Sequence, residues 1–544
     1  LTVGSDETSR NLTWYTNSDI AGEVQYAKKA DMTGDVFPEV YSSAPASSTA
    51  ANDAGYYSNQ ATMTGLEENT EYVYRVVNGD TVSQTYSFAT GEFDGAFSFA
   101  FVGDPQIGAG STDTDIEGWD QTLDVIKNNL NPDFMISSGD QINTASNETQ
   151  YAGYLNDTLT SLTSATTIGN HDSSSAAYSE HFNLPNESAA LGATTAGTDY
   201  WFVYNNTLFI DINSNDLSTA EHVEFIKSAI AANPDVKWKT VIFHHSVYST
   251  ASHVNDGDII QRREQLPAEF ENLDIDVVLM GHDHVYTRTY MMVEENGSIV
   301  PDKTEEVQSS VTNPEGVLYL TANSASGSKY YDIKAPEAEY AAVQDQSYRR
   351  TVTDIEVTDT SYTMTTYYAD DMSVLDTFTI NKLPKPDTTE LEQLITEAGS
   401  LNEADYTADS WSAFQSAYEA AQAILENTEA SQADIDSCAG ALRDAMNALV
   451  KADTEDPEQP GEKPGNPDDS SGTGDEGNGN NNGNGTDNNG ANGNGTSGNK
   501  TSTSSGNKVN TPKTGDTVNT VAAVLIIAAT GTMIFILGRK KIRL

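Results

Sequence analysis

The chain has 544 residues, and its 28 lysines and arginines stand against 81 aspartates and glutamates, a formal net charge of −53. Nucleic acid is bound by basic surfaces, so this balance excludes a general affinity for DNA or RNA. The single cysteine, Cys438, excludes an intrachain disulfide and a zinc site built on cysteines. Apolar residues make up only 37% of the chain, so part of it should lie outside any packed core.

Residues 1–92 have the strand-like alternation of apolar and polar side chains, interrupted by turns. Candidate strands are Asn11–Tyr15, Tyr72–Val76 and Thr85–Phe88. With Thr64-Gly65-Leu66 ahead of Tyr72, this pattern resembles an all-β fibronectin type III sandwich. The segment contains no histidine and its acidic residues are scattered, so no chemistry is expected there.

Residues 93–381 alternate short apolar runs with helical patterns. The runs that predict strands are Phe97–Val102, Phe134–Ile136, Leu208–Ile212, Thr240–Phe243 and Val277–Met280. Helical spacing appears at Trp119, Leu123, Ile126 and Leu130, and again at Val223, Ile226 and Ile230 behind a predicted capping box of Ser218 and Glu221. Alternating strands and helices predict a layered α/β fold.

Five polar clusters follow apolar runs in this region, and all eight histidines of the chain lie between His171 and His284. The clusters are Gly103-Asp104-Pro105-Gln106, Gly139-Asp140-Gln141, Gly169-Asn170-His171-Asp172, His244-His245 and Gly281-His282-Asp283-His284. Sheets of α/β proteins carry their sites at the carboxyl ends of strands, and carboxylate, imidazole and amide donors suit Zn, Mn or Fe. Singly, each cluster could be a turn, a helix cap or a core residue. As an ordered set, they favour a metal site.

The order of these clusters resembles that of the calcineurin-like metallophosphoesterases, and the preceding β-domain makes the chain most similar to the purple acid phosphatases. The resemblance implies a β-sandwich flanked by helices, with two metal ions. It implies that Asp104, Asp140 and His284 hold the first metal and that Asp140 bridges to a second, held also by Asn170, His244 and His282. His282 and His284 alternate around Asp283, so both are expected to project to the same side.

Two positions depart from the family pattern. Many members have a histidine two residues after the first aspartate, where this chain has Gln106. Purple acid phosphatases have a tyrosine ligand three residues after the bridging aspartate, where this chain has Asn143. The amide oxygen of Gln106 or a water molecule would complete the coordination of the first metal. The two ions, divalent or trivalent, could be Fe, Zn or Mn.

The function that the resemblance implies is an acid-phosphatase-like hydrolase of phosphomonoesters, with attack by a metal-activated hydroxide. His171 is the candidate proton donor to the leaving oxygen. His245 and His253 are candidates for contact with the substrate phosphate. Arg288 could make such a contact or form a structural ion pair. His181 and His222 are expected to pack in the fold or lie on its surface. Alternatives are a phosphodiesterase or nucleotidase with the same site, or a surface adhesin without catalysis.

Residues 388–451 contain three amphipathic helical patterns that can close a small three-helix bundle. Their apolar faces are Leu391, Leu394, Ile395 and Ala398; Trp411, Phe414, Tyr418 and Leu425; and Ile435, Ala439, Leu442, Met446 and Leu449. The bundle resembles the FIVAR modules of bacterial surface proteins. A spacer is expected, with glycan contact as the alternative, and Cys438 is expected to be a structural thiol.

The C-terminal part predicts a stalk and an anchor. Residues 452–510 should be disordered, because 20 of the 30 residues from Ser471 to Lys500 are Gly or Asn. The charge-free run of 22 residues from Thr517 to Gly538 is long enough to span a membrane, and basic residues follow it.

The motif before this run completes an anchoring signal at residues 511–544. Thr511, Pro512, Thr514 and Gly515 resemble the LPxTG sorting signal of Gram-positive surface proteins, with Thr511 in place of leucine. The resemblance implies cleavage after Thr514 by a sortase and linkage to peptidoglycan, hence a secreted protein on the cell wall. No export signal is visible from Leu1, so we interpret the sequence as a mature or trimmed form.

Overall fold

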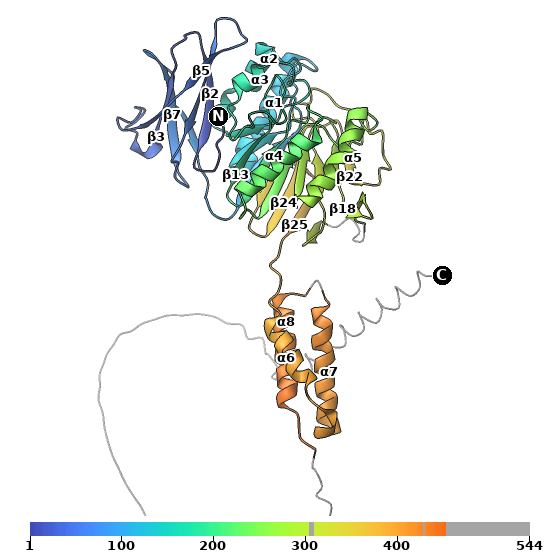
Figure 1. Cartoon of the computed structure of the whole chain (residues 1–544). Helices are drawn as coiled ribbons and strands as arrows, with labels where there is room; N and C mark the ends of the chain where they lie inside the picture. The colour runs from blue at the N-terminus through green and yellow to red at the C-terminus, as the bar shows by residue number, and fades with distance from the viewer. Residues whose placement is uncertain (304–308, 428–429, 453–544) are drawn as a thin grey trace, which may run out of the picture. The chain divides into compact units, whose positions relative to one another are not determined.

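The computed structural model describes residues 1–303, 309–427 and 430–452, and these divide into two compact units (Figure 1). One unit runs from Leu1 to Pro384 and the other begins at Lys385. Within the described ranges, no helix combines the length and apolar character that a membrane crossing requires. The predicted stalk from residue 453 on and the predicted sorting signal, 511–544, lie outside the described residues.

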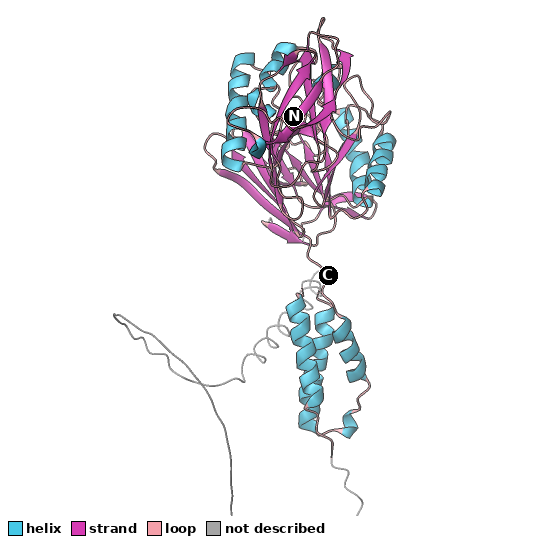
Figure 2. Ribbon diagram, turned by 90° about the vertical axis from the view of Figure 1, so that its left-hand side faces the viewer, coloured by secondary structure: helices cyan, strands magenta, loops and turns pink. Residues whose placement is uncertain are grey.

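Two large sheets and the helices on their outer faces build most of the first unit (Figure 2). Over the described residues, the first sheet has the order β20 (Ser310–Thr312), β25 (Val374–Asn381), β24 (Ser361–Tyr368), β23 (Thr351–Val357), β10 (Phe97–Val102), β11 (Phe134–Ser137), β12 (Ser164–Thr166), β1 (Thr2–Val3), β2 (Arg10–Thr16), β6 (Tyr57–Met63) and β5 (Ser47–Ala50). The second has β13 (Tyr200–Tyr204), β14 (Thr207–Asp211), β15 (Trp238–Ile242), β16 (Val277–Met280), β21 (Leu318–Thr321), β17 (Tyr286–Thr289) and β22 (Ala341–Asp345).

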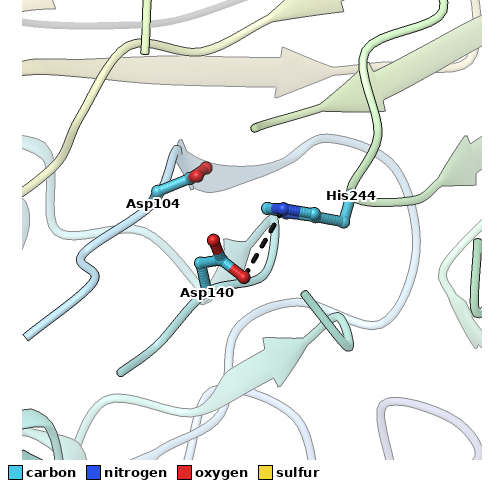
Figure 3. Close-up of side chains that lie close together, drawn as sticks. All are labelled: Asp104, Asp140 and His244. Carbon is cyan, nitrogen blue, oxygen red and sulfur yellow. Dashed lines mark ion pairs between the residues drawn. The ribbon is translucent and has the colours of Figure 1, made fainter. Parts of the chain in front are cut away.

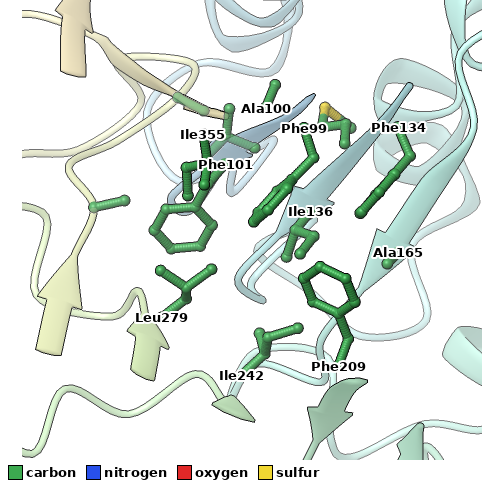
Figure 4. Packing of buried hydrophobic residues seen from close by; sticks show 14 of the residues in the cluster. Phe99, Ala100, Phe101, Phe134, Ile136, Ala165, Phe209, Ile242, Leu279 and Ile355 are labelled. Carbon is green, nitrogen blue, oxygen red and sulfur yellow. The ribbon is translucent and has the colours of Figure 1, made fainter. Parts of the chain in front are cut away.

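The core between the sheets is built from large aromatic and branched side chains (Figure 4). Phe99 and Phe134, on neighbouring parallel strands, stack with ring centroids 5.1 Å apart. Phe209 of the second sheet packs edge-on against both rings. Strands that are covered on both faces must be apolar along most of their length, which explains the near-continuous run in β10. The predicted α/β fold is therefore confirmed.

Helices α1 (Thr112–Val125), α2 (Glu148–Tyr154), α3 (Ala177–His181), α4 (Thr219–Ala232) and α5 (Gly257–Asn272) belong to this unit. The predicted helix around Trp119 is α1, which continues into a π-helical turn at Ile126–Leu130. The predicted capping box of α4 is wrong. Ser218 makes no side-chain cap hydrogen bond, and Glu221 instead accepts a hydrogen bond from the backbone N–H of Gly192.

The N-terminal β-structure shares a sheet with the rest of the unit. Its second sheet contains β4 (Ser42–Pro45), β3 (Glu23–Lys28), β7 (Glu71–Asn78), β8 (Thr81–Val82) and β9 (Tyr86–Ala89). Its first sheet continues into the main one, because β1 pairs in parallel with β12 through Thr2 and Ser164. Side chains add to this junction, for example the Tyr74 hydroxyl, which donates to the carbonyl of Thr160 at 2.7 Å. A separate hairpin is formed by β18 (Met292–Glu295) and β19 (Ser298–Pro301).

The second unit contains α6 (Thr389–Gly399), α7 (Ala408–Leu425) and α8 (Gln432–Asn447), as the helical spacing predicts. Most of the predicted apolar faces lie in its core, but Leu425 is 36% exposed because it is the last residue of α7, and Ala421, one turn earlier, is fully buried instead. A capping box does form in this unit. Ser431 accepts a hydrogen bond from the backbone N–H of Asp434, whose carboxylate accepts one from the N–H of Ser431.

Candidate metal centre

The two sheets bring their strand ends together at one site. Asp104 and Asp140 follow β10 and β11, which are parallel, and His244 follows β15 of the second sheet. These three buried side chains each offer one ligand atom, and the three atoms lie within 4.8 Å of one another (Figure 3). Asp140 Oδ1 lies 3.5 Å from His244 Nε2, and Asp104 Oδ2 is buried without a hydrogen-bond partner. An unpartnered buried carboxylate oxygen beside an imidazole nitrogen fits a cation.

The remaining predicted ligands surround this triad. His244 Nε2 lies 3.0 Å from Oδ1 of Asn170 and 3.1 Å from Nδ1 of His282. On the other side, His284 Nε2 lies 3.3 Å from Oδ2 of Asp104. The structure thus places all six side chains in one connected cluster of three residue types, Asp, Asn and His, whose oxygen and nitrogen atoms suit transition metals.

The backbone that carries these side chains is in unusual conformations. Gln106, Asp140, His282 and His284 have φ of 38°, 48°, 70° and 47°, in the left-handed region that side chains other than glycine seldom adopt. Such conformations store strain and persist only where surrounding contacts impose them. The strain is therefore concentrated at this cluster.

Two contacts explain how the left-handed turns are held. The backbone N–H of His282 donates to Oδ1 of Asp104 at 2.9 Å, and that of His171 donates to Oδ1 of Asp140 at 2.8 Å. Gly169 packs against the latter site so closely that an added Cβ would lie 2.0 Å from the backbone nitrogen of Asp140. Glycine is therefore required there.

His282 and His284 both reach the cluster, but the expected reason, alternation along an extended strand, is wrong. The segment is not an extended strand, since the backbone of both histidines is in the left-handed conformation. Asp283 between them is buried, and its carboxylate accepts hydrogen bonds from the Ser249 hydroxyl and from the backbone N–H groups of Thr250 and Ala251. This carboxylate anchors the turn, and both histidines reach the cluster from it.

The two positions that depart from the family pattern contact each other. Gln106 is fully buried, its Nε2 donates to Oδ1 of Asn143 at 3.4 Å, and its Oε1 has no hydrogen-bond partner. This free oxygen could serve as a ligand atom. The Asn143 carbonyl accepts a hydrogen bond from Nδ1 of His171 at 2.8 Å, so this residue orients a histidine.

Burial dominates the electrostatics of the cluster. It raises the pKa of Asp104 to about 7 and that of Asp140 to about 6, although the nearby positive charges of His171 and Lys329 act against the shift at Asp140. Burial also lowers the pKa of His244, and it lowers the pKa of His282 and His284 well below their usual value. The histidines are therefore neutral, the state in which imidazole binds a metal.

Three more histidines lie around the cluster. His171 is half-buried, and its Nε2 lies 4.0 Å from Oδ2 of Asp140. The His253 ring lies 4.0 Å from that of His282, and its Nδ1 lies 2.7 Å from the Asp256 carboxylate. His245 is 5% exposed, its ring lies 4.7 Å from that of His282, and its Nδ1 is 2.9 Å from the Ser214 hydroxyl.

Three residues considered from the sequence make other contacts. His181 pairs with Glu148 at 2.8 Å, and His222 pairs with Asp199 at 2.8 Å. Arg288 forms an ion pair with Asp376 at 2.6 Å, which agrees with the structural alternative considered for it.

Sequence reasoning missed the loop after β21. Its Lys329 and Tyr331 lie beside the cluster, where the Tyr331 ring centroid is 5.3 Å from that of His284. The apolar run Leu318–Thr321 followed by the polar stretch Asn323–Ser328 is the same strand-end signal that revealed the five clusters. It contains no histidine or acidic residue, and for this reason it escaped notice.

Comparison with known families agrees with this site. Residues 97–286 match the calcineurin-like phosphoesterases, residues 1–90 the N-terminal domain of purple acid phosphatases, and residues 387–450 the FIVAR domain. The chain contains a calcineurin-like phosphoesterase domain. These matches confirm the resemblances to calcineurin-like phosphoesterases, to the purple acid phosphatases and to FIVAR modules.

Solved and curated relatives are distant. A purple acid phosphatase from yellow lupin (Lupinus luteus) seeds superposes with a TM-score of 0.57 and 16% identity, over 70% of this chain and 73% of that chain, and shares the fold. An uncharacterized protein of Mycobacterium tuberculosis is 22% identical over 180 residues, 30% of this chain and 34% of that protein. An alpha-L-arabinofuranosidase of Bifidobacterium longum is 38% identical over 154 residues, 28% of this chain and 10% of that protein. The chain thus spans only a small part of these curated relatives.

Cation binding to the phosphoesterase domain should depend on pH. Asp104 and Asp140 hold protons more tightly in the fold than in the unfolded chain, so the apoprotein loses stability as pH rises through about 6 to 7. A cation must displace these protons below that range but meets free carboxylates above it. Mn²⁺ should therefore raise the melting temperature more at about pH 8 than at about pH 5, as differential scanning fluorimetry would measure. An equal shift at both pH values would contradict this expectation.

Proposed function

We propose that the protein is a metal-dependent phosphatase that hydrolyses phosphomonoesters outside the cell. The observation that carries the proposal is the convergence of Asp104, Asp140 and His244 from two sheets, with Asp104 Oδ2 buried and making no hydrogen bond. A fold shared with a purple acid phosphatase supports the same reaction class. We assign Asp104, Asp140, His284 and Gln106 to one ion, and Asp140, Asn170, His244 and His282 to a second.

The metal ions would stabilise charge on the phosphoryl oxygens and activate water for attack on phosphorus. The side chains of the chain position the other participants. Since phosphoryl transfer relies mainly on positioning and charge stabilisation, no protein nucleophile is required. Buried histidines kept neutral by their surroundings hold the ligand geometry without competing for protons.

His171 is the proton donor in this proposal. Its Nδ1 lies 2.8 Å from the Asn143 carbonyl, which can only accept, so Nδ1 carries a hydrogen. The other nitrogen, Nε2, faces Asp140 and is the one that can deliver a proton to the leaving oxygen. The His171 side chain is 32% exposed, so a substrate can reach it. His253 is oriented by Asp256 and is assigned to a phosphoryl oxygen, as is His245.

The variant Asp140→Asn tests the metal assignment. The amide can still accept from the N–H of His171, but it lacks the charge that holds two cations, so bound metal and phosphatase activity should be lost together. Elemental analysis and turnover of an aryl phosphate measure the two losses. The control is Asp274→Asn, which removes an equal charge from an exposed carboxylate paired with Lys239. Near-normal activity in Asp140→Asn would refute the assignment.

The variant His171→Ala tests proton donation. His171 is not assigned as a ligand, so both metals should stay bound while the rate falls by about 10²–10⁴-fold for alkyl phosphates. Substrates with good leaving groups need less protonation and should lose less. Steady-state kinetics across a series of leaving groups measures this difference, and an equal loss for every leaving group would argue against a proton-donor role.

We also propose that the protein is exported and linked to peptidoglycan through Thr514, with the run Thr517–Gly538 holding it in the membrane beforehand. The support is the order of Thr511–Gly515, an apolar run and a basic tail in the sequence. Deletion of Thr511–Gly515 should move the protein from the wall fraction to the membrane or the medium. Cell fractionation with immunoblotting measures the distribution, and unchanged wall attachment would disprove this signal.

A further inference from the structure

The loop of residues 324–335, here called the arch, is attached at both ends to the metal centre's own loops. At one end, the Ser324 hydroxyl donates to the carbonyl of Asp104 at 3.2 Å and the Ser328 hydroxyl donates to that of Pro105 at 3.2 Å. At the other end, the backbone N–H of Lys334 donates to the carbonyl of Thr250 at 2.8 Å. The middle of the arch is therefore held in place beside the cluster.

Tyr331 fixes the middle of the arch against two histidines. Its ring centroid lies 5.3 Å from that of His253 and 5.3 Å from that of His284. Gln346 Nε2 donates to the carbonyl of Tyr331 and also to that of His284, at 2.7 Å for the latter. The Lys329 ammonium lies 4.7 Å from the centroid of the Tyr331 ring. The lysine thus lies against a ring that itself packs beside one histidine assigned to metal and one assigned to phosphate.

Lys329 has no carboxylate partner among the described residues, although the chain has 81 acidic residues. Lys334 of the same arch pairs with Asp332 at 3.2 Å. The Lys329 ammonium faces the ring of Tyr331 instead, and this ring packs beside His253 and His284 of the centre. A chain with a net charge of −53 repels anions, so an anionic substrate requires a local positive charge of this kind.

We propose that Lys329 binds a non-bridging oxygen of the substrate's phosphoryl group and makes the site selective for monoesters over diesters. This inference rests on the proposed function. A lysine ammonium acts as a point charge on a flexible stem, so its contribution scales with the charge that it meets. A phosphomonoester carries close to two negative charges at neutral pH and a diester carries one. The contribution of Lys329 should therefore be about twice as large, on a logarithmic scale, for the monoester.

The test compares Lys329→Met with Lys334→Met, which removes the same charge from the same arch at a residue that is already paired. In the metal-loaded full chain, Lys329→Met should lower kcat/KM for an aryl phosphate by about tenfold or more, and for the matching diaryl phosphate by about threefold. It should weaken the binding of inorganic phosphate, measured by titration calorimetry, by about tenfold as well. Lys329→Arg should restore part of both, and Lys334→Met should stay within about twofold of wild type.

Metal content and melting temperature of each variant show whether the centre and the fold are intact, and Lys329→Gln, which also removes the charge, replaces Lys329→Met if that variant is unfolded. Unchanged phosphate affinity in Lys329→Met would overturn the inference, as would equal losses in Lys329→Met and Lys334→Met or equal losses for both ester classes. A wild-type protein that binds phosphate through Lys329 but hydrolyses no ester would refute the proposed function and leave the phosphate contact standing. If the wild type hydrolyses esters and Lys329→Met is equally active, the role of Lys329 would be refuted and the proposed function would stand.

Discussion

Burial of two carboxylates at the junction of two sheets is the constraint on which the site depends. Asp104 and Asp140 are 1% and 2% exposed, and withdrawing a carboxylate from water costs on the order of several kcal/mol even after relaxation. Two backbone N–H groups, from His282 and His171, offset part of this cost. The oxygens that remain, with neutral imidazoles around them, form a centre whose negative charge a cation would balance. Burial raises the pKa of both carboxyls for the same reason, because it disfavours their charged form.

The sandwich core supplies the rigidity that such a centre requires. Phe99, Phe134 and Phe209 lock the two sheets face to face, so the loops after β10, β11 and β15 cannot separate without opening the core. Because β1 pairs with β12, the N-terminal β-structure continues the same sheet. It therefore supports the strand that leads to Asn170 and His171. A rigid frame of this kind holds ligand atoms in place even where the backbone is strained.

Charge is distributed unevenly in this protein. The net charge of −53 keeps the chain soluble and would repel a phosphate ester at long range. Near the centre lie His171, His253 and Lys329, and each contacts a specific neighbour: the Asn143 carbonyl, the Asp256 carboxylate and the Tyr331 ring, respectively. Orientation by neighbours matters because catalysis of phosphoryl transfer depends on positioning more than on nucleophilic side chains.

The sequence alone determined the strands that deliver the polar clusters, the helical character of residues 388–451 and the residue types of the centre, because strand and helix periods and strand-end motifs are local signals. Tertiary structure alone decided other features. Glu221 accepts a hydrogen bond from the backbone N–H of Gly192 instead of capping its helix. His282 and His284 reach the centre through left-handed turns. In both cases tertiary packing overrides the local preference. The β1–β12 pairing and the arch depend on contacts between residues far apart in the chain, such as Ser324 with Asp104. No local pattern encodes those contacts, and so the place of Lys329 beside the centre emerged only from the folded chain.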